Sequence, residues 1–378
     1  MRFVHLGIHT EFSISESIVR IPDLIKAAVN EEMPALALTD LSNLHAAIKF
    51  YTKCLDKGIK PILGSNIRLN NAEHKATLLA MSNKGWRNLT EIVSRGFIEG
   101  QQLDIPCVHK EWILEQNQDL IVLLGMHSDV GKMLNSSNPQ KAEPLLEEWI
   151  EKFGNRVYFA LTRTDRPDEE SFIAGAIQLA QKHNIGVVAH NDVHFIAQTD
   201  FEAHEARVCI ADGYVLGDSR RPRYYSPEQY FKTAEEMTAL FSDIPTAIEN
   251  TYHIAKRCNV SLRLGFNDLP DYPVPEGHTI DTFFAYVSQQ GLEERLNLLY
   301  PIEKRDEGWL EIRRKYDERL TYEISTILNM GFPGYFLIVM DFIQWSKNNG
   351  VPVGPGRGSG AGSLVAYSLK ITDLDPLR

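Results

Sequence analysis

Cysteine is scarce in this sequence, and the four cysteines, at positions 54, 107, 209 and 258, form no C-x-x-C pair. This scatter argues against a zinc ribbon or a disulfide framework, so free thiols are expected. Long apolar runs are also lacking, because no stretch reaches the length that spans a membrane. The chain begins with a strand-like segment and without the layout of a secretory leader. These absences predict a cytoplasmic protein without a membrane partner.

Positive charge is in short supply as well. The 378 residues contain 39 Lys and Arg against 50 Asp and Glu, which gives a formal net charge of −11. That balance argues against a surface that wraps nucleic acid over its whole extent, although local basic patches remain possible. The length predicts two or more domains, each able to bury a core.

Short apolar runs alternate with amphipathic runs over about the first 265 residues. This alternation of strands and helices predicts an α/β fold with a parallel sheet, closed as a barrel or left open. The predicted strands are 3–8, 35–39, 61–69, 77–80, 120–124, 157–161 and 185–189. The predicted helices are 22–32, 43–57, 86–95, 144–153, 169–183, 200–211, 227–241 and 245–258.

Polar residues follow three of these strands. His9 follows the first strand, Asp40 the second, and Asp192 and His194 the last. Histidine and aspartate at neighbouring strand ends are typical of a metal site. The other strand ends carry Asn66, Lys75 and Met126, so a centre of two or three metals would lack ligands. A lone histidine on such an element is more often structural than a ligand.

A proline-rich stretch, 265–277, separates this region from a second one with predicted helices 282–299, 309–330 and 335–345. Residues 217–225, called the polar arm here, precede the proline-rich stretch and contain three arginines and two tyrosines. This arm fits contact with nucleic acid or a partner by stacking and charge, and it fits a solvated loop equally well.

Glycine stands at every second position from 354 to 362. Such a backbone can adopt positive φ and turn its N–H groups toward an anion, and a helix predicted to begin near Ser363 adds partial positive charge. The run has no lysine, which excludes a Walker loop, and its spacing is not that of a dinucleotide fingerprint. It predicts a triphosphate site formed by Gly356, Arg357, Gly358, Ser359, Gly360 and Ser363. The alternative is a tight turn without a ligand.

Several motifs resemble the alpha subunits of bacterial DNA polymerase III, the C-family replicative polymerases. They are residues 3–6, 9–13, 33–40, 58–64, 191–194, 331–336 and 354–363. The resemblance implies a PHP (polymerase and histidinol phosphatase) domain of β/α-barrel type at 1–265, a linker at 266–278, and at 279–378 the mostly helical beginning of an α+β palm domain. It implies Mg²⁺-dependent addition of deoxynucleotides (dNTPs) to a DNA primer on a template. It also implies that Gly358 and Ser359, with Arg357 beside them, hold the phosphates of the incoming nucleotide.

The chain departs from the family's metal-binding pattern at five of nine ligand positions. Only His9, Asp40, Asp192 and His194 remain; the others are Gly7, Leu41, Asn66, Lys75 and Met126. This predicts a vestigial PHP site with no tightly bound metal and no proofreading activity. The resemblance then implies a PHP domain that docks a separate proofreading exonuclease, the epsilon subunit.

The family places its catalytic aspartates beyond the point matched by Arg378. Asp373 and Asp375 have suitable spacing, but Pro376 argues against a continuing central strand, so we expect both to be structural. The 378 residues are thus expected to be a piece of a longer polymerase, inactive alone, whose sliding clamp and other subunits bind elsewhere. The alternatives are a metal-dependent PHP phosphoesterase or exonuclease, and an interaction scaffold.

Overall fold

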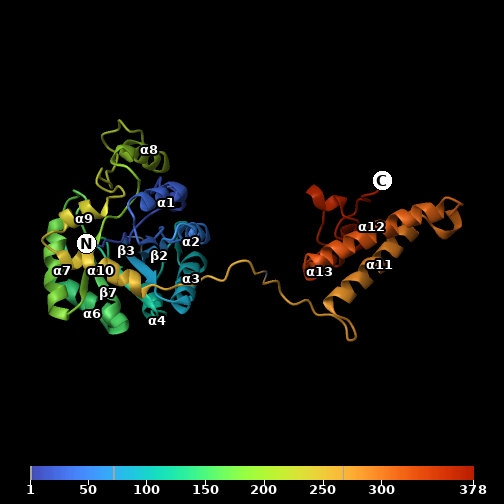
Figure 1. Ribbon diagram of the computed structural model, residues 1–378, viewed down its shortest axis with the longest axis horizontal. Helices are drawn as coiled ribbons and strands as arrows, with labels where there is room; N and C mark the ends of the chain where they lie inside the picture. The colour runs from blue at the N-terminus through green and yellow to red at the C-terminus, as the bar shows by residue number, and fades with distance from the viewer. Residues whose placement is uncertain (1, 71–72, 267) are drawn as a thin grey trace. The chain divides into compact units, whose positions relative to one another are not determined.

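The structure, a computed structural model, describes residues 2–70, 73–266 and 268–378. Its contacts divide the chain into two compact units, Met1–Leu262 and Arg263–Arg378. Figure 1 draws the first unit from blue to yellow and the second from orange to red.

A six-stranded sheet forms the centre of the first unit. Its strand order is β1-β2-β3-β6-β7-β8, and β4 and β5 form a separate small hairpin. The strands are β1 Ala35–Leu38, β2 Lys60–Leu69, β3 His74–Ala80, β4 Gln101–Gln102, β5 Ile105–Pro106, β6 Leu120–Leu124, β7 Val157–Thr162 and β8 Gly186–His190. The predicted α/β class is confirmed.

The sheet is mixed, and the prediction of a parallel sheet is wrong for one strand. β3 runs antiparallel to both β2 and β6, whereas β1 with β2, β6 with β7 and β7 with β8 are parallel pairs. The reason is the short connection between Leu69 and His74, which is too short for a crossover and therefore joins antiparallel neighbours.

Residues 3–8 were predicted to be a strand, but they form no regular strand. They nevertheless lie between the two edges of the sheet. On one side, Ala37 N donates to His5 O (3.0 Å) and Thr39 N donates to Ile8 O (3.0 Å); on the other, Ile8 forms a parallel bridge with Val193. This segment therefore links β1 to the chain that follows β8, so the curled sheet approaches a closed barrel.

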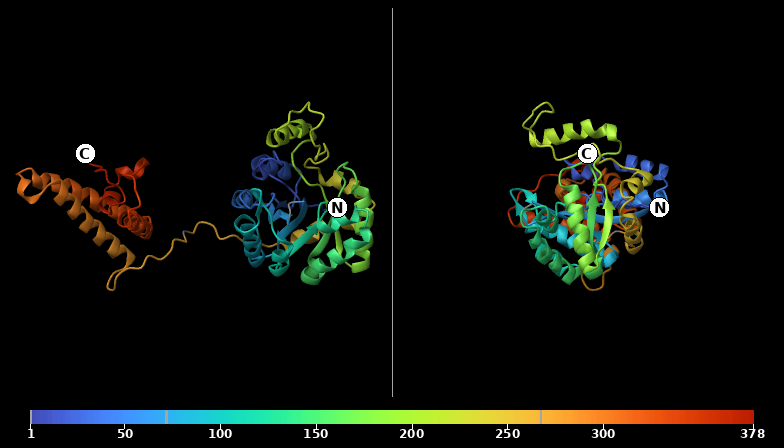
Figure 2. Two further views of the ribbon diagram at one scale, coloured as in Figure 1. Left: turned by 180° about the vertical axis from the view of Figure 1, so that it is seen from behind. Right: turned by 90° about the vertical axis from the view of Figure 1, so that its left-hand side faces the viewer.

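Helices surround this sheet (Figures 1 and 2). They are α1 Ile21–Asn30, α2 Ala47–Asp56, α3 Asn83–Ile98, α4 Lys110–Glu115, α5 Asp129–Leu134, α6 Ala142–Phe153, α7 Glu169–His183, α8 Phe201–Asp212, α9 Ala234–Leu240 and α10 Pro245–Arg257. α6 illustrates how the sequence determines a helix and its end. Leu146, Trp149 and Phe153 share one buried face, and Gly154 ends the helix with a φ of 56°.

The prediction of one helix over 227–241 is wrong in its first half, because only α9 is helical there. Phe231 N donates to the carbonyl of Phe195 at 3.1 Å, which engages this segment before the helix begins. Thr233 and Glu236 then form a capping box that fixes the start of α9.

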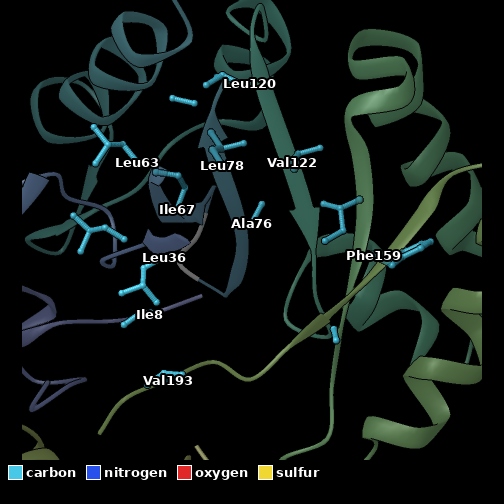
Figure 3. Packing of buried hydrophobic residues seen from close by; sticks show 14 of the residues in the cluster. Ile8, Leu36, Leu63, Ile67, Ala76, Leu78, Leu120, Val122, Phe159 and Val193 are labelled. Atoms are coloured by element: carbon cyan, nitrogen blue, oxygen red, sulfur yellow. The ribbon is translucent and has the colours of Figure 1, made fainter. Parts of the chain in front are cut away.

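Alternate residues of each strand face two different cores, as expected for a side-chain period of two. Leu36 of β1 and Val122 of β6 belong to the larger core, which also contains residues of the surrounding helices; Figure 3 shows members from β1, β2, β3, β6 and β7. Ala37 and Leu123 belong to the smaller core on the inner face of the sheet, together with Ile254 of α10. α10 lies at the amino ends of β7 and β8, since its side chains bond to Tyr158 and Val187. The inner face is thus covered at that end.

The second unit consists of α11 Ile280–Leu299, α12 Trp309–Asn329, α13 Pro333–Asn348, a 3-10 turn Gly358–Gly362 and the short α14 Leu364–Ser368. Phe284, Leu337 and Leu364 are fully buried in its core. Within the described residues, no single helix is long and apolar enough to cross a membrane. α12 and α13 pass that test only as a pair, bent by 112° at their junction.

Candidate functional site

A cavity of about 640 Å³ opens on the inner face of the sheet, at the carboxyl ends of β6, β7 and β8. Leu123, Thr162 and His190 belong to its wall from those strands, and the loops that follow the strands complete it. Ligand sites in sheets with parallel strands form at such ends, because the loops there carry side chains toward a common point.

Three of the four predicted ligands meet in this cavity. The Nε2 atoms of His9 and His194 lie 3.3 Å and 3.4 Å from Asp192 Oδ1. The two imidazole rings are stacked with centroids 4.5 Å apart, and both residues are 2% exposed. Each residue of this trio offers one donor atom within 4.8 Å of the others, so the set could hold one cation.

Burial shapes the protonation of this trio. Loss of solvent lowers the pKa of His194 to about 4, so its imidazole is neutral near pH 7. Burial by itself would raise the pKa of Asp192, but His194, His9 and Arg166 outweigh it and hold that pKa well below the usual range. His194 Nδ1 donates to the carbonyl oxygen of Glu16 at 2.5 Å, which leaves Nε2 as the nitrogen that faces Asp192.

Asp40, the fourth predicted ligand, is not part of this group. Its carboxylate accepts hydrogen bonds from the backbone and hydroxyl of Thr10 and from the hydroxyl of Ser13, at 2.6 to 3.0 Å, and it is fully buried. Burial raises the pKa of Asp40, against the effect of these donors. The carboxylate therefore holds the loop after the first segment in place.

The position of the first missing ligand is filled by another side chain. A Cβ atom on Gly7 would lie 1.9 Å from Cε1 and 2.2 Å from Nε2 of His190. His190 is 8% exposed, and burial lowers its pKa to about 4. The imidazole of His190 thus occupies the space that a side chain at position 7 would need.

Lysine at position 75 is part of an ion-pair cluster. Its ammonium lies 3.4 Å from Glu16, whose other oxygen is 3.0 Å from Arg68. Burial would raise the pKa of Glu16, but Lys75, His9 and Arg68 keep it below the usual value. A carboxylate that could serve a metal is therefore already neutralised by two fixed cations.

Arg166 supplies a third fixed cation. Its guanidinium lies 3.5 Å from Asp192 Oδ2, and the amide of Gln229 donates to the same oxygen at 3.0 Å. Sequence reasoning missed Glu16, Arg68 and Arg166, because the search was for metal ligands that follow the strands. His190, the last residue of β8, belongs to the histidines that were expected to be structural. The nearest signal is the excess of charged residues in the loops after Leu161 and Thr10.

The polar arm closes part of the cavity wall. Tyr224 and Tyr225 line it, and the ring of Tyr225 packs edge-on against His194 with centroids 4.8 Å apart. The arm is anchored by an ion pair between Arg221 and Glu205 of α8, both buried. Part of the arm is therefore docked on the first unit, which differs from a fully solvated loop.

The glycine-rich loop lies in the second unit. Only Gly356 (φ 121°) and Gly358 (φ 59°) of its five glycines use positive φ, and a Cβ on Gly356 would also contact Thr372 at 2.9 Å. Arg357 and Ser359 are exposed, and among the residues that the structure describes none pairs with the Arg357 guanidinium. Residues 356–360 are thus exposed and accessible to a ligand.

Ser363 differs from the other predicted residues of this loop. A helix begins beside Ser363, as predicted, and the Ser363 hydroxyl caps it by accepting a hydrogen bond from Ala366 N. Its hydroxyl also donates to Glu323 at 2.8 Å, and the same carboxylate accepts hydrogen bonds from the N–H groups of Leu364 and Val365, both at 3.1 Å. A side chain of the protein itself therefore takes the place at this helix start that was assigned to phosphate.

The two candidate aspartates near the end are both engaged. Asp373 pairs with Arg295 and Lys347, each at 2.9 Å, and Asp375 accepts a hydrogen bond from the hydroxyl of Tyr316 at 2.5 Å. These contacts fit the structural role expected of them.

Comparisons with known proteins identify relatives of both units. A family model described as PHP domain matches residues 5–164, and one described as bacterial DNA polymerase III alpha NTPase domain matches residues 283–378. The chain is 52% identical over 382 residues to the DNA polymerase III subunit alpha of Pseudomonas fluorescens, covering 100% of this chain and 32% of that protein. The subunits of Pseudomonas aeruginosa (51%, covering 99% and 32%) and Escherichia coli K12 (48%, covering 100% and 33%) are similar.

A solved amidohydrolase from Chromobacterium violaceum is 12% identical, with a TM-score of 0.34, and the match covers 54% of this chain and 96% of that one. The chain spans about a third of the length of the curated relatives it matches. The resemblance predicted from the motifs is confirmed: along its whole length the chain is similar to part of the bacterial DNA polymerase III alpha subunit, and its first unit carries a PHP domain.

Proposed function

We propose that this chain is part of the catalytic subunit of a bacterial replicative DNA polymerase, which extends a primer with deoxynucleotides in the cytoplasm. The observation that carries the proposal is the identity of about one half to polymerase alpha subunits over the entire chain. Its substrates are then a DNA primer-template and dNTPs. The sliding clamp and further subunits bind outside these residues.

The nucleotide's phosphates bind the glycine-rich loop in this proposal. The exposed guanidinium of Arg357, the hydroxyl of Ser359 and the open backbone of residues 356–360 support it, because a guanidinium fork and converging amides suit phosphate oxygens. Removing Arg357 then weakens dNTP binding, and the Arg357→Lys variant recovers only part of it, since lysine lacks the planar fork.

The two candidate aspartates near the end of the chain supply no free carboxylates for the Mg²⁺ ions of nucleotidyl transfer. Asp373 and Asp375 are held by other side chains. The ions therefore do not fit here, and the acidic residues that bind them lie elsewhere in the longer protein. The 378 residues are inactive alone in this proposal.

The cavity of the first unit, called the PHP cavity from here on, is a site whose metal ions have been replaced by fixed positive side chains. Lys75 and Arg68 neutralise Glu16, Arg166 pairs with Asp192, and His190 fills the space beside Gly7. A centre of two or three metals does not fit these residues. The domain then lacks proofreading chemistry of its own and serves to dock the exonuclease subunit.

Exposed apolar side chains on the first unit support a docking role. Ile210 of α8 is 82% exposed and Val215, just beyond the helix, is 70% exposed. Charged substitutions at Ile210 and Val215 should weaken retention of the purified exonuclease subunit, while the exposed Leu103, on the β4–β5 turn, serves as the control. Equal retention by all variants argues against this surface.

Primer extension tests the main proposal. The 378-residue chain should extend no primer, whereas the longer subunit should, and Arg357→Ala in the longer subunit should raise the KM for dNTP at least tenfold. Arg220→Ala, at an exposed arginine of the polar arm that pairs with Asp218, is the matched control. Primer extension by the 378 residues alone, or an unchanged KM for Arg357→Ala, contradicts the proposal.

A metal-dependent phosphoesterase or exonuclease is the second candidate, favoured by the trio His9, Asp192 and His194. Metal analysis of the purified chain separates the two. Stoichiometric, tightly bound zinc or manganese that disappears in Asp192→Asn supports the second candidate, and its absence together with no phosphatase activity supports the vestigial site.

A further inference from the structure

We propose that Glu323 is a positioning residue of the nucleotide site: it occupies the N–H groups at the start of α14 and so confines the nucleotide's phosphates to residues 357–360. This inference rests on the proposed function. It differs from the loop predicted from the sequence, in which Ser363 and the start of the helix were themselves phosphate ligands.

The contacts of Glu323 are complete. Oε1 accepts from Leu364 N at 3.1 Å, and Oε2 accepts from Val365 N at 3.1 Å and from the hydroxyl of Ser363 at 2.8 Å. The side chain is about nine-tenths buried. Both oxygens therefore already do for the helix start what a phosphate would do there, and a second anion at the same place would meet a buried negative charge.

A second side chain of α12 holds the preceding peptide. Arg319, one turn before Glu323, donates from Nε to Glu323 Oε1 at 2.6 Å and from a terminal nitrogen to the carbonyl of Gly362 at 3.2 Å. Two residues one turn apart on the same helix thus fix residues 362–365. The Arg319 bond also orients the carboxylate, since it restricts the rotation of the Glu323 side chain.

The loop before this anchor is held differently. Asp373 N donates to the carbonyl of Pro355 at 2.8 Å, and Gly356 packs so closely on Thr372 that a Cβ there would lie 2.9 Å from its side chain. Between these two anchors the residues from Arg357 to Gly360 are exposed, and the last of them belong to the 3-10 turn Gly358–Gly362, in which Gly360 O accepts a hydrogen bond from Ser363 N at 3.2 Å. This short span therefore lies between two fixed ends, so loosening the Glu323 end disorders the phosphate-binding span without removing any of its residues.

A titration of the 378-residue chain with dATP and Mg²⁺, followed through backbone amide signals, tests this assignment. The signals of residues 357–360 should shift, while those of Leu364 and Val365 should remain in place. Glu323→Gln preserves the shape but puts an amide where two acceptors are needed, and it should raise the Kd for dATP on the order of tenfold. Glu318→Gln, on the exposed side of α12 where Glu318 pairs with Arg314, should bind dATP as the unchanged chain does.

Two further variants separate the possible failures. Arg319→Gln removes the two contacts of Arg319 but leaves the bonds between Glu323 and the start of α14, so it should weaken binding less than Glu323→Gln. It keeps the test valid if Glu323→Gln does not fold. Ser363→Ala should have a small effect, whereas a large effect together with shifts at Leu364 and Val365 would make the helix start a phosphate ligand and overturn the inference. Unchanged binding by both Glu323→Gln and Arg319→Gln also overturns it. If dATP leaves residues 357–360 of the unchanged chain unmoved, the proposed phosphate loop itself fails.

Discussion

Replacing Gly7 by alanine tests the claim that His190 has taken the space of a lost metal ligand. A Cβ at this position would approach three ring atoms of His190, at 1.9, 2.2 and 2.9 Å. Contacts under 3.0 Å force a displacement. The ring cannot move freely, because His190 ends β8 and is 8% exposed.

Alanine at position 7 changes the free energy of unfolding in two opposite ways. Gly7 has an ordinary negative φ, so alanine there would normally stabilise the chain by about 0.4–1 kcal/mol by restricting the unfolded state. Overpacking of a filled core instead destabilises by about 1–3 kcal/mol. We expect the second effect to win, because the overlap is with a ring inside the sheet. For a unit of this size, each 1 kcal/mol corresponds to about 2–4 °C in Tm.

Calorimetric unfolding of the 378-residue chain measures this change in the transition of the first unit. Gly217→Ala is the matched control, since its Cβ would meet nothing within 4 Å, and it should leave the Tm unchanged or slightly higher. In a His190→Ala background the cost of Gly7→Ala should fall by at least about 1 kcal/mol, because the two positions contact each other. A stabilising Gly7→Ala, or an equal cost in both backgrounds, refutes the reasoning.

Three further outcomes follow from the contacts of single side chains. Burial lowers the pKa of His5 from 6.5 to about 4, so the contribution of neutral His5 to stability is complete above pH 6.5. This contribution is lost as the pH falls toward 4, by about 3 kcal/mol in all. Urea unfolding at pH 7 and pH 4.5 should show the loss, and His5→Gln should reduce it. Glu205→Ala leaves Arg221 without its buried partner, so trypsin should cut the polar arm several-fold faster than in the unchanged chain, and an equal rate would show that the ion pair does not anchor the arm. Asp375→Asn should destabilise the second unit by about 1–3 kcal/mol while dATP binding is retained, whereas loss of binding at unchanged stability would make Asp375 a functional residue.

Much of the fold follows from local sequence patterns. β6, β7, β8, α6 and α7 lie within one or two residues of their predicted bounds, because each has a strong apolar pattern and clear end signals, such as Asn184 in the left-handed conformation after α7. The direction of β3 did not follow from its own residues, since an apolar strand reads the same in either direction. Only the short connection after Leu69 contains that information.

For residues 3–8, the sequence predicted burial but not the irregular pairing of the backbone. Their apolar pattern correctly indicated an extended, buried segment, and Phe3, Val4, Leu6 and Ile8 are all at most 1% exposed. Their backbone bonds go to two distant segments, around Ala37 and Val193, in an irregular ladder. Sequence patterns describe which faces are buried, but regularity of pairing depends on partners about 30 and 185 positions away.

The candidate metal site was also predicted only in part. Strand-end positions correctly brought His9, Asp192 and His194 together, because the carboxyl ends of neighbouring strands converge. Asp40 satisfied the same rule but is held by Thr10 and Ser13, two hydroxyl residues 30 and 27 positions earlier in the chain. Whether a carboxylate faces a cavity or a hydroxyl depends on a competition between partners that a motif does not contain.

The substitutions at the ligand positions have a consequence that a count of missing ligands does not give. A depleted site would regain its metal as ligands were restored one by one, since the remaining donors would be waiting for it. Here Gly7 faces the ring of His190, and Lys75 is paired with Glu16, so each position has acquired a new partner. A histidine returned to position 7 would first have to displace His190, and one returned to position 75 would leave Glu16 with Arg68 alone. If the PHP cavity is the vestigial site proposed above, it has been rebuilt around fixed cations, and we expect recovery of metal binding to require coordinated replacement of these partners along with the ligands themselves.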